Sequence, residues 1–398
     1  MEKFYITPEV LGTSSGLEVS QEGFRVIEKI PADEWVLSVS PTDGLDLCCL
    51  FRLGASPIDP APPAKWKAAM SAVGVQGQVP WASVMPQSQY RSFIKNLIKS
   101  VISKFDELPK EYYKNTWIQC GSVLRSLRPA KIDTLLHKEL IESEGISNGA
   151  LETFKPGPGG YSQPVVYDRF GTRTGRLTVE SGPNILTLKK EHRKILKSYY
   201  ANGRIVSIDF STLEARIILL EAGRIPASDD IYRQISTELF KGAVQRSVVK
   251  VAVLSELYGV SRASLAHRLQ MNDADLDRFI ATIKGYFKTD ALKLRLKDEL
   301  EKCGMIRNKF GRPLFIDAKN SDYLLVNTYA QSTGVDVAMA GFNSILRRLG
   351  DDGIRPLFVL HDALILDVRE DRIDDVFSVN DVSVHGFEPK FPLKCETL

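Results

Sequence analysis

The chain has 398 residues, of which 43% are hydrophobic, and a formal net charge of only +3 at pH 7. This length and apolar content predict two or three lobes with real hydrophobic cores, and the modest total charge is compatible with an acidic centre inside a basic surface. No apolar run spans a membrane, no secretory signal is recognisable, and the five cysteines lack disulfide or metal spacing, which argues against a membrane or secreted protein.

The first 85 residues are the least informative part of the chain. Short apolar alternations at 25–27 and 35–37 predict a few strands, and the proline-rich stretch 57–63 predicts an irregular connector. The sequence indicates no role for this region.

A basic helical segment follows at residues 86–150. Arg91, Lys95 and Lys99 recur every four residues, which places them on one face of a helix. Between residues 91 and 140 there are ten Lys and Arg against five Asp and Glu. Such a surface is suited to binding the phosphates of a nucleic-acid duplex, a contact that does not depend on the base sequence. The structural alternative is a solvated amphipathic bundle.

Two later segments each place an aspartate in a predicted strand. Residues 207–216 predict a strand that ends at Asp209 and turns into a helix. Residues 358–368 predict a buried strand, in which the apolar run 359–366 is interrupted only by His361 and Asp362. Phosphoryl transfer uses two divalent ions about 4 Å apart. Magnesium needs only one or two carboxylates plus substrate phosphates, so two aspartates on adjacent antiparallel strands suffice. Taken singly, Asp209 could be a helix cap and the His-Asp pair a buried ion pair.

The region between these strands, residues 230–319, is predicted to be mostly helical. One helix, at 244–258, carries on one face Arg246, Lys250, Leu254 and Tyr258. Two cations for phosphate oxygens followed by an apolar platform for base and sugar match the two ends of a nucleotide. Lys250 alone could equally be a solvated surface charge.

Five collinear motifs resemble DNA polymerase family A, the DNA polymerase I family. Residues 209–216 resemble its motif A (Asp-Tyr-Ser-Gln-Ile-Glu-Leu-Arg), and residues 360–363 its motif C (Val-His-Asp-Glu). Motif B is matched by Arg246, Lys250, Tyr258 and Gly259. Two further segments are matched by Thr174, Gly175, Arg176 and Leu177 with Pro183 and Asn184, and by Asn327, Gln331 and Asp336. The resemblance runs from about Val166 to the end of the chain.

The resemblance implies an α+β right-hand polymerase fold with an antiparallel-sheet palm, helical fingers and a helical thumb. The expected parts are an N-terminal region of unknown role (1–85), the thumb (86–160), the first part of the palm (161–221), the fingers (222–319) and the second part of the palm (320–398). A Pro-Gly-rich break at 156–160 marks the expected end of the thumb.

The resemblance also assigns roles to residues of this chain. Catalysis is expected of Asp209, Asp362 and Lys250. Two Mg²⁺ ions, with Mn²⁺ as a substitute, are expected to be bound by Asp209, Asp362 and Phe210. Substrate binding is expected of Arg246, Tyr258, Glu214, Leu254, Tyr232 and Thr212. DNA binding is expected of Arg176, Asn327, Gln331, His361, Arg91, Lys95 and Lys99. The expected partners are primer–template DNA and dNTPs, with an exonuclease or replication factors acting in trans and no membrane.

Departures from the family pattern keep other functions open. Leu254 stands in place of an aromatic residue, Thr212 in place of Gln, Tyr232 in place of a frequent His, and Ala363 in place of the motif C Glu. Some of these are also typical of single-subunit RNA polymerases, which together with primase-like enzymes are the first alternative. Glu214 favours DNA synthesis, because a Glu there excludes a 2′-hydroxyl by a clash. An inactive nucleic-acid-binding relic of a polymerase is the second alternative.

The sequence also predicts a polymerase without its own proofreading. An exonuclease would add roughly 200 residues, the size of a domain, before the thumb. The preceding region has about 85 residues and no Asp-x-Glu metal motif. This compact format suggests a phage, plasmid or other mobile element, and hence a protein of the cytoplasm of a bacterial host.

Overall fold

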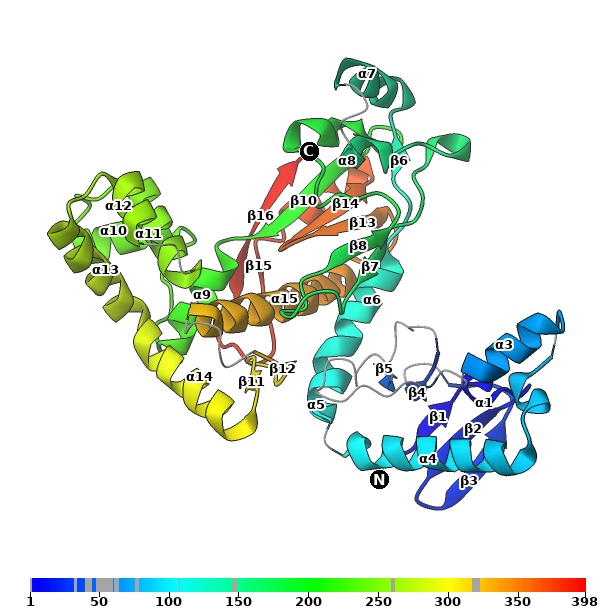
Figure 1. Cartoon of the computed structure of the whole chain (residues 1–398). Coiled ribbons are helices and arrows are strands. Elements are labelled where there is room, and N and C mark those ends of the chain that lie inside the picture. Colours follow the sequence, from blue (N-terminus) through cyan, green and yellow to red (C-terminus); the bar gives the residue numbers. More distant parts are fainter. Residues whose placement is uncertain are drawn as a thin grey trace. The chain divides into compact units, whose positions relative to one another are not determined.

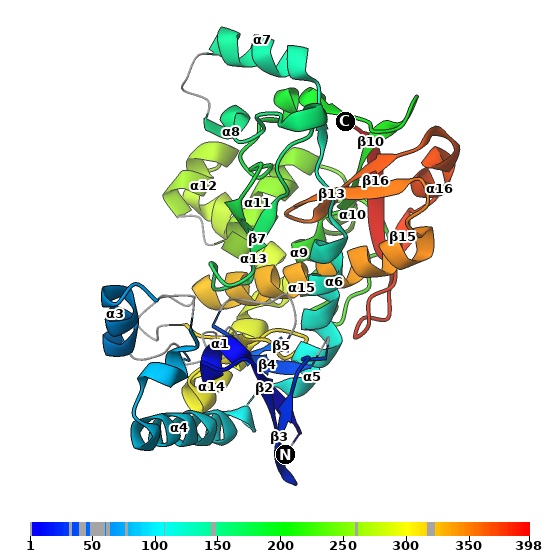
Figure 2. The ribbon, with the colours of Figure 1, turned by 90° about the vertical axis from the view of Figure 1, so that its right-hand side faces the viewer.

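The computed structural model describes residues 2–31, 34–39, 45–47, 60, 64–75, 79–106, 108–144, 149–258, 262–316 and 323–398. Most of the expected connector at 57–63, the Cys48–Cys49 pair and Gly259 of motif B lie outside these residues. The chain divides into two compact units, Met1–Gly121 and Ser122–Leu398, each described by itself (Figures 1 and 2).

The first unit is built on a five-stranded sheet in the order β3-β2-β1-β4-β5. Its strands are β1 (Phe4–Ile6), β2 (Gly16–Ser20), β3 (Gly23–Ile27), β4 (Trp35–Leu37) and β5 (Leu45–Asp46). The helical segments are α1 (Pro8–Leu11), α3 (Ala64–Ala72), η1 (Trp81–Val84), α4 (Gln87–Phe105), α5 (Lys110–Tyr112) and η2 (Tyr113–Trp117). The strands predicted near residues 25 and 35 are therefore confirmed as β3 and β4.

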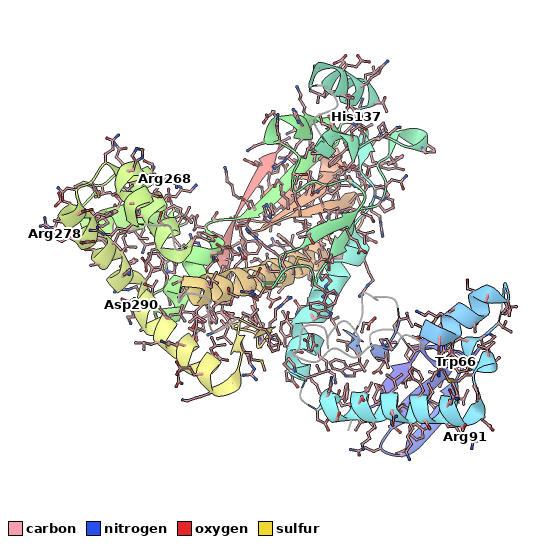
Figure 3. The ribbon with its side chains drawn as sticks, viewed as in Figure 1. Trp66, Arg91, His137, Arg268, Arg278 and Asp290 are labelled. Atoms are coloured by element: carbon pink, nitrogen blue, oxygen red, sulfur yellow. The ribbon has the colours of Figure 1, made fainter. Side chains whose placement is uncertain are left out.

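Helix α4 belongs to this first unit. At its end, Phe105 packs against Phe4 and Trp35, with ring centroids 5.7 and 5.3 Å apart. Near its start, Phe93 packs edge-on against Trp81 at 5.6 Å. The domain boundary expected between residues 85 and 86 thus falls inside a compact unit, because the apolar face of α4 packs on the N-terminal strands. The opposite face carries the exposed Arg91 (Figure 3), Lys95 and Lys99.

The second unit contains a larger sheet and most of the helices. Helix α6 (Ile118–Ser126) contains the boundary between the two units. It is followed by β6 (Lys131–Ile132), α7 (Thr134–Glu144), α8 (Gly149–Glu152), η3 (Pro158–Gly160), β7 (Val166–Asp168), β8 (Thr178–Ser181), η4 (Lys190–Ile195), β9 (Leu196–Lys197), β10 (Arg204–Phe210) and α9 (Leu213–Glu221). A helical lobe follows, with α10 (Ile231–Phe240), α11 (Arg246–Tyr258), α12 (Arg262–Leu269), α13 (Asp273–Phe287) and α14 (Thr289–Cys303). The chain then continues through β11 (Ile306–Arg307), β12 (Pro313–Leu314), α15 (Tyr323–Leu349), β13 (Ile354–Leu360), β14 (Ala363–Val368), η5 (Glu370–Arg372), α16 (Ile373–Phe377), β15 (Asp381–Val382) and β16 (Phe391–Thr397).

The main sheet has the order β13-β14-β10-β16-β15, and all of its neighbouring strands are antiparallel. Strand β10 lies at its centre. Helix α15 packs on one face of it, where Phe210 of β10 stacks against Phe342 at 5.6 Å (Figure 1). The other face is partly covered by Ile185, Leu188 and Ile195 from the segment that precedes β10.

One predicted strand requires correction. The apolar run at 358–368 was expected to form a single strand, but it forms the hairpin of β13 and β14, with His361 and Asp362 as a two-residue turn. A tight hairpin turn needs a positive backbone φ, and His361 provides one at φ 57°.

The helical lobe forms because its helices bury one apolar face each. In α11 the residues Val249, Ala252, Val253 and Leu257 are buried at helical spacing. They join a core that includes Ile235 of α10 and Ile283 of α13. As predicted, Arg246, Lys250 and Tyr258 are exposed on the other side, with Leu254 half-buried.

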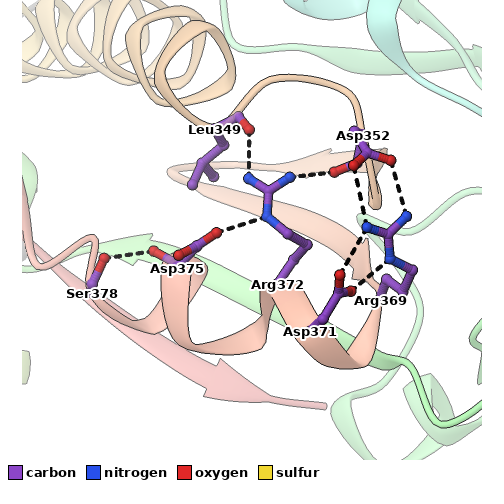
Figure 4. Close-up of polar contacts among 7 residues, drawn as sticks. All are labelled: Leu349, Asp352, Arg369, Asp371, Arg372, Asp375 and Ser378. Carbon is purple, nitrogen blue, oxygen red and sulfur yellow. Dashed lines mark hydrogen bonds and ion pairs between the residues drawn. The ribbon is translucent and has the colours of Figure 1, made fainter.

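A network of ion pairs fastens the end of α15 to the segment that follows β14 (Figure 4). Arg369 binds both Asp352 and Asp371, at 2.9 and 2.6 Å. Arg372 donates to the carbonyl oxygen of Leu349 at 2.8 Å, which caps the last turn of α15. Single exposed pairs contribute little, but a network shared among several charges holds its elements in register.

Candidate active site

The two aspartates that the sequence singles out lie side by side on the main sheet. Asp209 is the last residue but one of β10 and lies opposite Ala363, and the Phe210 N–H donates to the carbonyl oxygen of Asp362 at 3.1 Å. Burial, together with the charges of Asp362 and Glu396, raises the pKa of Asp209 to about 7. Burial also raises the pKa of Asp362. Two half-buried carboxylates that disfavour each other's charge form a site that attracts cations.

Two strained residues flank this pair of carboxylates. Thr212, at the start of α9, has φ 56°, and His361, just before Asp362, has φ 57°. A positive φ is uncommon outside glycine, and for a β-branched residue such as Thr it is an outlier. Strain of this kind is typical of functional sites, where the surrounding structure holds it in place.

A pocket beside Asp362 gathers residues from four predicted motifs. It is lined by Arg176, Leu177, Leu213, Glu214, Gln331, Gly334, Val335, Ala338, Met339, His361 and Asp362. Five of these were predicted as site residues, namely Arg176, Glu214, Gln331, His361 and Asp362. The apolar lining from α15 was missed, although residues 331, 334, 335, 338 and 339 have the spacing of one helix face and could have been recognised by it.

Glu214 is held in this pocket in an unusual environment. Burial raises its pKa to about 7, the charge of Asp362 adds to the rise, and Arg176 opposes it. Gly334 of α15 packs beside it, where an added Cβ would lie 3.5 Å from the Glu214 Cγ. No hydrogen bond joins Glu214 to Tyr258, both of which the structure describes, and Tyr258 does not line the pocket.

The Thr174-Gly175-Arg176 motif is fixed against two other motifs. The Thr174 hydroxyl donates to Gln331 Oε1 at 2.9 Å, which joins it to α15. Gly175 has φ +80°, and a Cβ at this position would collide with the guanidinium of Arg312. Glycine is therefore required here both for its backbone conformation and for the close approach of Arg312.

Asn308 organises the turn that carries Arg312, a role that the sequence did not reveal. Its amide donates to Asp336 Oδ2 at 2.6 Å and to Ser332 Oγ at 3.1 Å, both on α15. The side-chain oxygen Oδ1 of Asn308 accepts hydrogen bonds from the N–H groups of Phe310 and Arg312 at 3.0 and 2.9 Å. This buried network explains why Asp336 belongs to the motif on α15. Asn327, on the same helix, is half-buried and does not line the pocket.

The predicted substrate-binding residues of the helical lobe form a second group at the start of α11. The Arg246 Nε lies 2.6 Å from Asp230 Oδ2, and its guanidinium lies 5.5 Å from the centre of the Tyr232 ring. Tyr232 is buried, and burial raises its pKa to about 12. Lys250 is exposed, and no carboxylate of the described chain forms an ion pair with it. None of these residues lines the pocket beside Asp362.

Arg216 connects the two groups. From α9 its buried guanidinium donates to the carbonyl oxygen of Ser211 at 2.9 Å and to those of Ser228 and Asp229 at 2.7 and 2.6 Å. It thus ties the turn after Asp209 to the loop that ends at Asp230. The motif A arginine therefore has a positioning role in this chain.

The donor set suits magnesium. Asp209 and Asp362 offer carboxylate oxygens, and Phe210 can contribute only its backbone carbonyl oxygen, because its side chain is a hydrocarbon without a donor atom. Oxygen donors of this kind are those Mg²⁺ prefers, with substrate phosphates completing the shell. In the part of the chain that the structure describes, no group of three or more His, Cys, Asp or Glu could hold a metal by itself.

Comparison with known proteins decides the family. The model of "DNA polymerase family A" matches residues 165–397, more than half of the chain. The chain belongs to DNA polymerase family A. This membership agrees with the resemblance of the five motifs to that family.

Relatives of this family A chain include three bacterial DNA polymerases I. That of Pseudomonas aeruginosa is 27% identical over 245 residues, which are 53% of this chain and 26% of the relative. That of Chloroflexus aurantiacus is 26% identical over 283 residues, 63% of this chain and 29% of the relative. The thermostable enzyme of Thermus thermophilus is 24% identical over 258 residues, 57% of this chain and 30% of the relative. The family A chain thus spans less than a third of these relatives.

A solved structure extends the comparison to the fold. The POL domain of Pol1 from M. smegmatis, in complex with DNA primer-template and dNTP, matches with a TM-score of 0.60 at 13% identity, over 100% of this chain and 94% of that one. This likeness confirms the predicted right-hand polymerase fold.

Among the described helices of this family A chain, none is long and apolar enough to cross a bilayer.

Proposed function

We propose that this protein is a DNA-directed DNA polymerase that adds deoxynucleotides to a primer 3′ end. The observation that carries the proposal is the convergence of Glu214, Arg176, Gln331 and Asp362 on one pocket beside Asp209. Membership of family A supports it. Primer–template DNA and dNTPs are the proposed substrates.

In the proposed reaction the carboxylates of Asp209 and Asp362 would hold the metal ions at the end of the central strand β10. Two Mg²⁺ ions, or Mn²⁺ in their place, would supply charge neutralisation for the attacking and leaving oxygens. Arg246 and Lys250 would bind the triphosphate, and Lys250 would protonate the leaving pyrophosphate. Arg176, Gln331 and His361 would contact the DNA near the primer end, and Asn327 would contact it farther along α15.

Glu214 decides between deoxyribonucleotides and ribonucleotides in this proposal. Its side chain lines the pocket next to Asp362 and lies beside Gly334 of α15. A 2′-hydroxyl would meet this side chain, whereas a deoxyribose would not. This supports DNA synthesis over the RNA-polymerase or primase alternative. The retained Asp209, Asp362 and Lys250 argue against an inactive relic.

Further parts of the proposal rest on the sequence alone. The exposed row of Arg91, Lys95 and Lys99 on α4 is proposed to bind duplex phosphates. The lack of intrinsic proofreading, the help of an exonuclease or replication factors in trans, and a phage or mobile-element origin with action in the bacterial cytoplasm stay predictions.

The test is extension of a labelled primer–template in Mg²⁺ with each dNTP and its matching rNTP. We expect extension with dNTPs and a strong preference over rNTPs. Asp362→Ala, purified in parallel, should be inactive, which excludes a contaminating polymerase. Equal use of both sugars would replace the proposal by the RNA-polymerase or primase alternative. Duplex binding without extension under any condition would favour the relic.

A further inference from the structure

The catalytic face of the main sheet carries a cation directly across from Asp209. In the pairing of β10 with β16, Asp209 lies opposite Lys394 and Ser207 lies opposite Glu396. Directly opposed residues in an antiparallel pair point to the same face and are close neighbours. Lys394 and Glu396 therefore share the face of Asp209, whereas the intervening Cys395 points to the other face. None of the five motifs includes these residues.

A second lysine joins them from another element. Lys190, at the start of η4, places its Nζ 3.1 Å from Glu396 Oε1, and the Lys394 Nζ lies 3.6 Å from Glu396 Oε2. Both lysine side chains are 70% exposed and Glu396 is 37% exposed. Because Lys394 lies directly opposite Asp209 and Lys190 contacts the neighbouring Glu396, both lysines lie on the face of the sheet that carries the Asp209 carboxylate.

Sheet order places this Lys-Glu-Lys cluster on a definite side of the reaction centre. Strand β14, which directly follows Asp362, lies on one side of β10, and β16 lies on the other. The pocket of Arg176, Gln331 and His361 lies on the Asp362 side. In phosphoryl transfer the attacking and leaving oxygens are roughly in line on opposite sides of the phosphorus. The proposed function places the primer end near Arg176, Gln331 and His361 on the Asp362 side, so the leaving group departs toward β16 on the other side of β10.

We propose that Lys394 and Lys190 form a pyrophosphate-binding site on the sheet. Glu396 holds their ammonium groups in place and competes with pyrophosphate for them. This inference rests on the proposed function. In the step it serves, the primer 3′ oxygen bonds to the α-phosphorus, and the bond from that phosphorus to the α,β-bridging oxygen breaks. The electron pair leaves with pyrophosphate, and the hydroxyl proton is lost to solvent.

The chemistry of the cluster fits a transient anion rather than a structural role. Exposed Lys–Glu pairs contribute little to stability, so their partners exchange at low cost. Pyrophosphate offers several charged oxygens to both lysines, and charge-assisted hydrogen bonds are about twice as strong as neutral ones. Glu396 disfavours permanent occupation, so the site can bind the product and then release it.

Two substitutions with opposite expected effects test the proposal, with inorganic pyrophosphate as the probe. Lys394→Ala should raise the inhibition constant of pyrophosphate about tenfold and slow pyrophosphorolysis, because one charged contact is lost. Glu396→Gln should lower the same constant several-fold, because it removes a negative charge beside the anion. Lys390→Ala is the matched control. This exposed lysine precedes β16 and pairs with Asp381 at 3.0 Å, away from Asp209, and its loss should change neither value.

Isothermal titration of pyrophosphate with Mg²⁺ into the full-length protein separates this inference from the proposed function. A protein that binds pyrophosphate through Lys394 but extends no primer would refute only the polymerase proposal. Unchanged pyrophosphate affinity in both Lys394→Ala and Glu396→Gln would overturn the inference. So would a loss in Lys394→Ala of duplex affinity alone, with a shallower salt dependence, because the lysine would then bind the nucleic-acid backbone.

Discussion

Asp230 holds Arg246 through one carboxylate oxygen and caps α10 with the other. The Arg246 Nε lies 2.6 Å from Asp230 Oδ2, and Asp230 Oδ1 accepts the N–H of Arg233 at 3.2 Å. The cation proposed to bind triphosphate is therefore already paired in this structure. An incoming nucleotide has to replace the Asp230 carboxylate with a phosphate.

This relationship predicts that Asp230→Asn lowers the KM for dNTP. Asn is as good a helix cap as Asp, so α10 should be kept while the competing charge is lost. Because Asp230 and Arg246 are partly exposed, their ion pair is worth at most about 1 kcal/mol, or roughly fivefold in KM. Single-nucleotide insertion kinetics measure the change. Asp230→Ala, which removes the cap too, should also lower the Tm. A higher KM in Asp230→Asn would mean that Asp230 instead holds Arg246 in its nucleotide-binding position.

Asp209→Ala and Asp362→Ala should each abolish primer extension while leaving primer–template affinity largely intact. Each removes half of the carboxylate pair, whereas the duplex is expected to be bound elsewhere. Fluorescence anisotropy with a labelled duplex, run beside single-turnover extension, gives both values. Near-normal turnover in Asp362→Ala would refute the site assignment, because no other carboxylate in this chain occupies the motif C position.

Lys250→Ala should slow nucleotide addition at least a hundredfold at saturating dNTP. A preorganised charge of this kind contributes about 3 kcal/mol to the transition state. Lys297→Ala, on the exposed surface of α14, is the matched control and should behave as the unmodified protein. If Lys250→Ala weakened only duplex binding, its face of α11 would contact the template rather than the nucleotide.

Glu214→Ala should raise ribonucleotide incorporation far more than it changes deoxynucleotide incorporation. Removing the side chain relieves a clash that only the 2′-hydroxyl experiences. Glu214→Gln distinguishes volume from charge: it should keep the discrimination, because the amide fills the same space. Matched dNTP and rNTP insertion rates test both variants. Loss of discrimination in Glu214→Gln as well would mean that the carboxylate charge, rather than its bulk, excludes ribose.

The proximity of Asp209 and Asp362 was predictable from sequence because each lies in a local pattern: Asp209 ends an apolar run that is followed by a helix, and Asp362 interrupts an apolar run. The hairpin at His361 was not, since His-Asp is an uncommon two-residue turn and the flanking apolar residues resemble one continuous strand. The contacts of Arg312 with Gly175 and of Asn308 with Asp336 were also hidden. They join residues far apart in the chain, and a single sequence carries no signal for such pairs.

The division of the chain was hidden for a similar reason. The apolar face of α4 predicts that the helix packs on something, but not which element. It packs on Trp81, Phe4 and Trp35 of the first unit. Lys394 and Glu396 could not be singled out from the sequence, because nothing in a short Lys-Cys-Glu stretch indicates that it lies beside Asp209. Only the pairing of β16 with β10 shows this.

Gly341→Ala should destabilise the protein and slow extension together. An added Cβ in α15 would lie 2.6 Å from the ring of Phe210 and 3.2 Å from Val382. Phe210 directly follows Asp209 and its ring packs against Phe342 and Phe391, so we expect displacement of the ring to shift the end of β10. Overpacking of this kind costs about 1–3 kcal/mol, more than the gain of up to ~1 kcal/mol from replacing a helical glycine.

Gly285→Ala provides the control for this last prediction. Gly285 lies in α13, and no atom comes within 4 Å of an added Cβ, so this variant should gain about 0.5–1 kcal/mol in the free energy of unfolding. Urea denaturation of both variants gives the stabilities, and single-turnover extension gives the rates. Phe210→Leu combined with Gly341→Ala should recover part of the stability, because the smaller side chain makes room for the methyl group. A Gly341→Ala protein with unchanged stability and rate would show that Phe210 can move without disturbing Asp209, and that the packing of α15 does not set the position of the catalytic carboxylate.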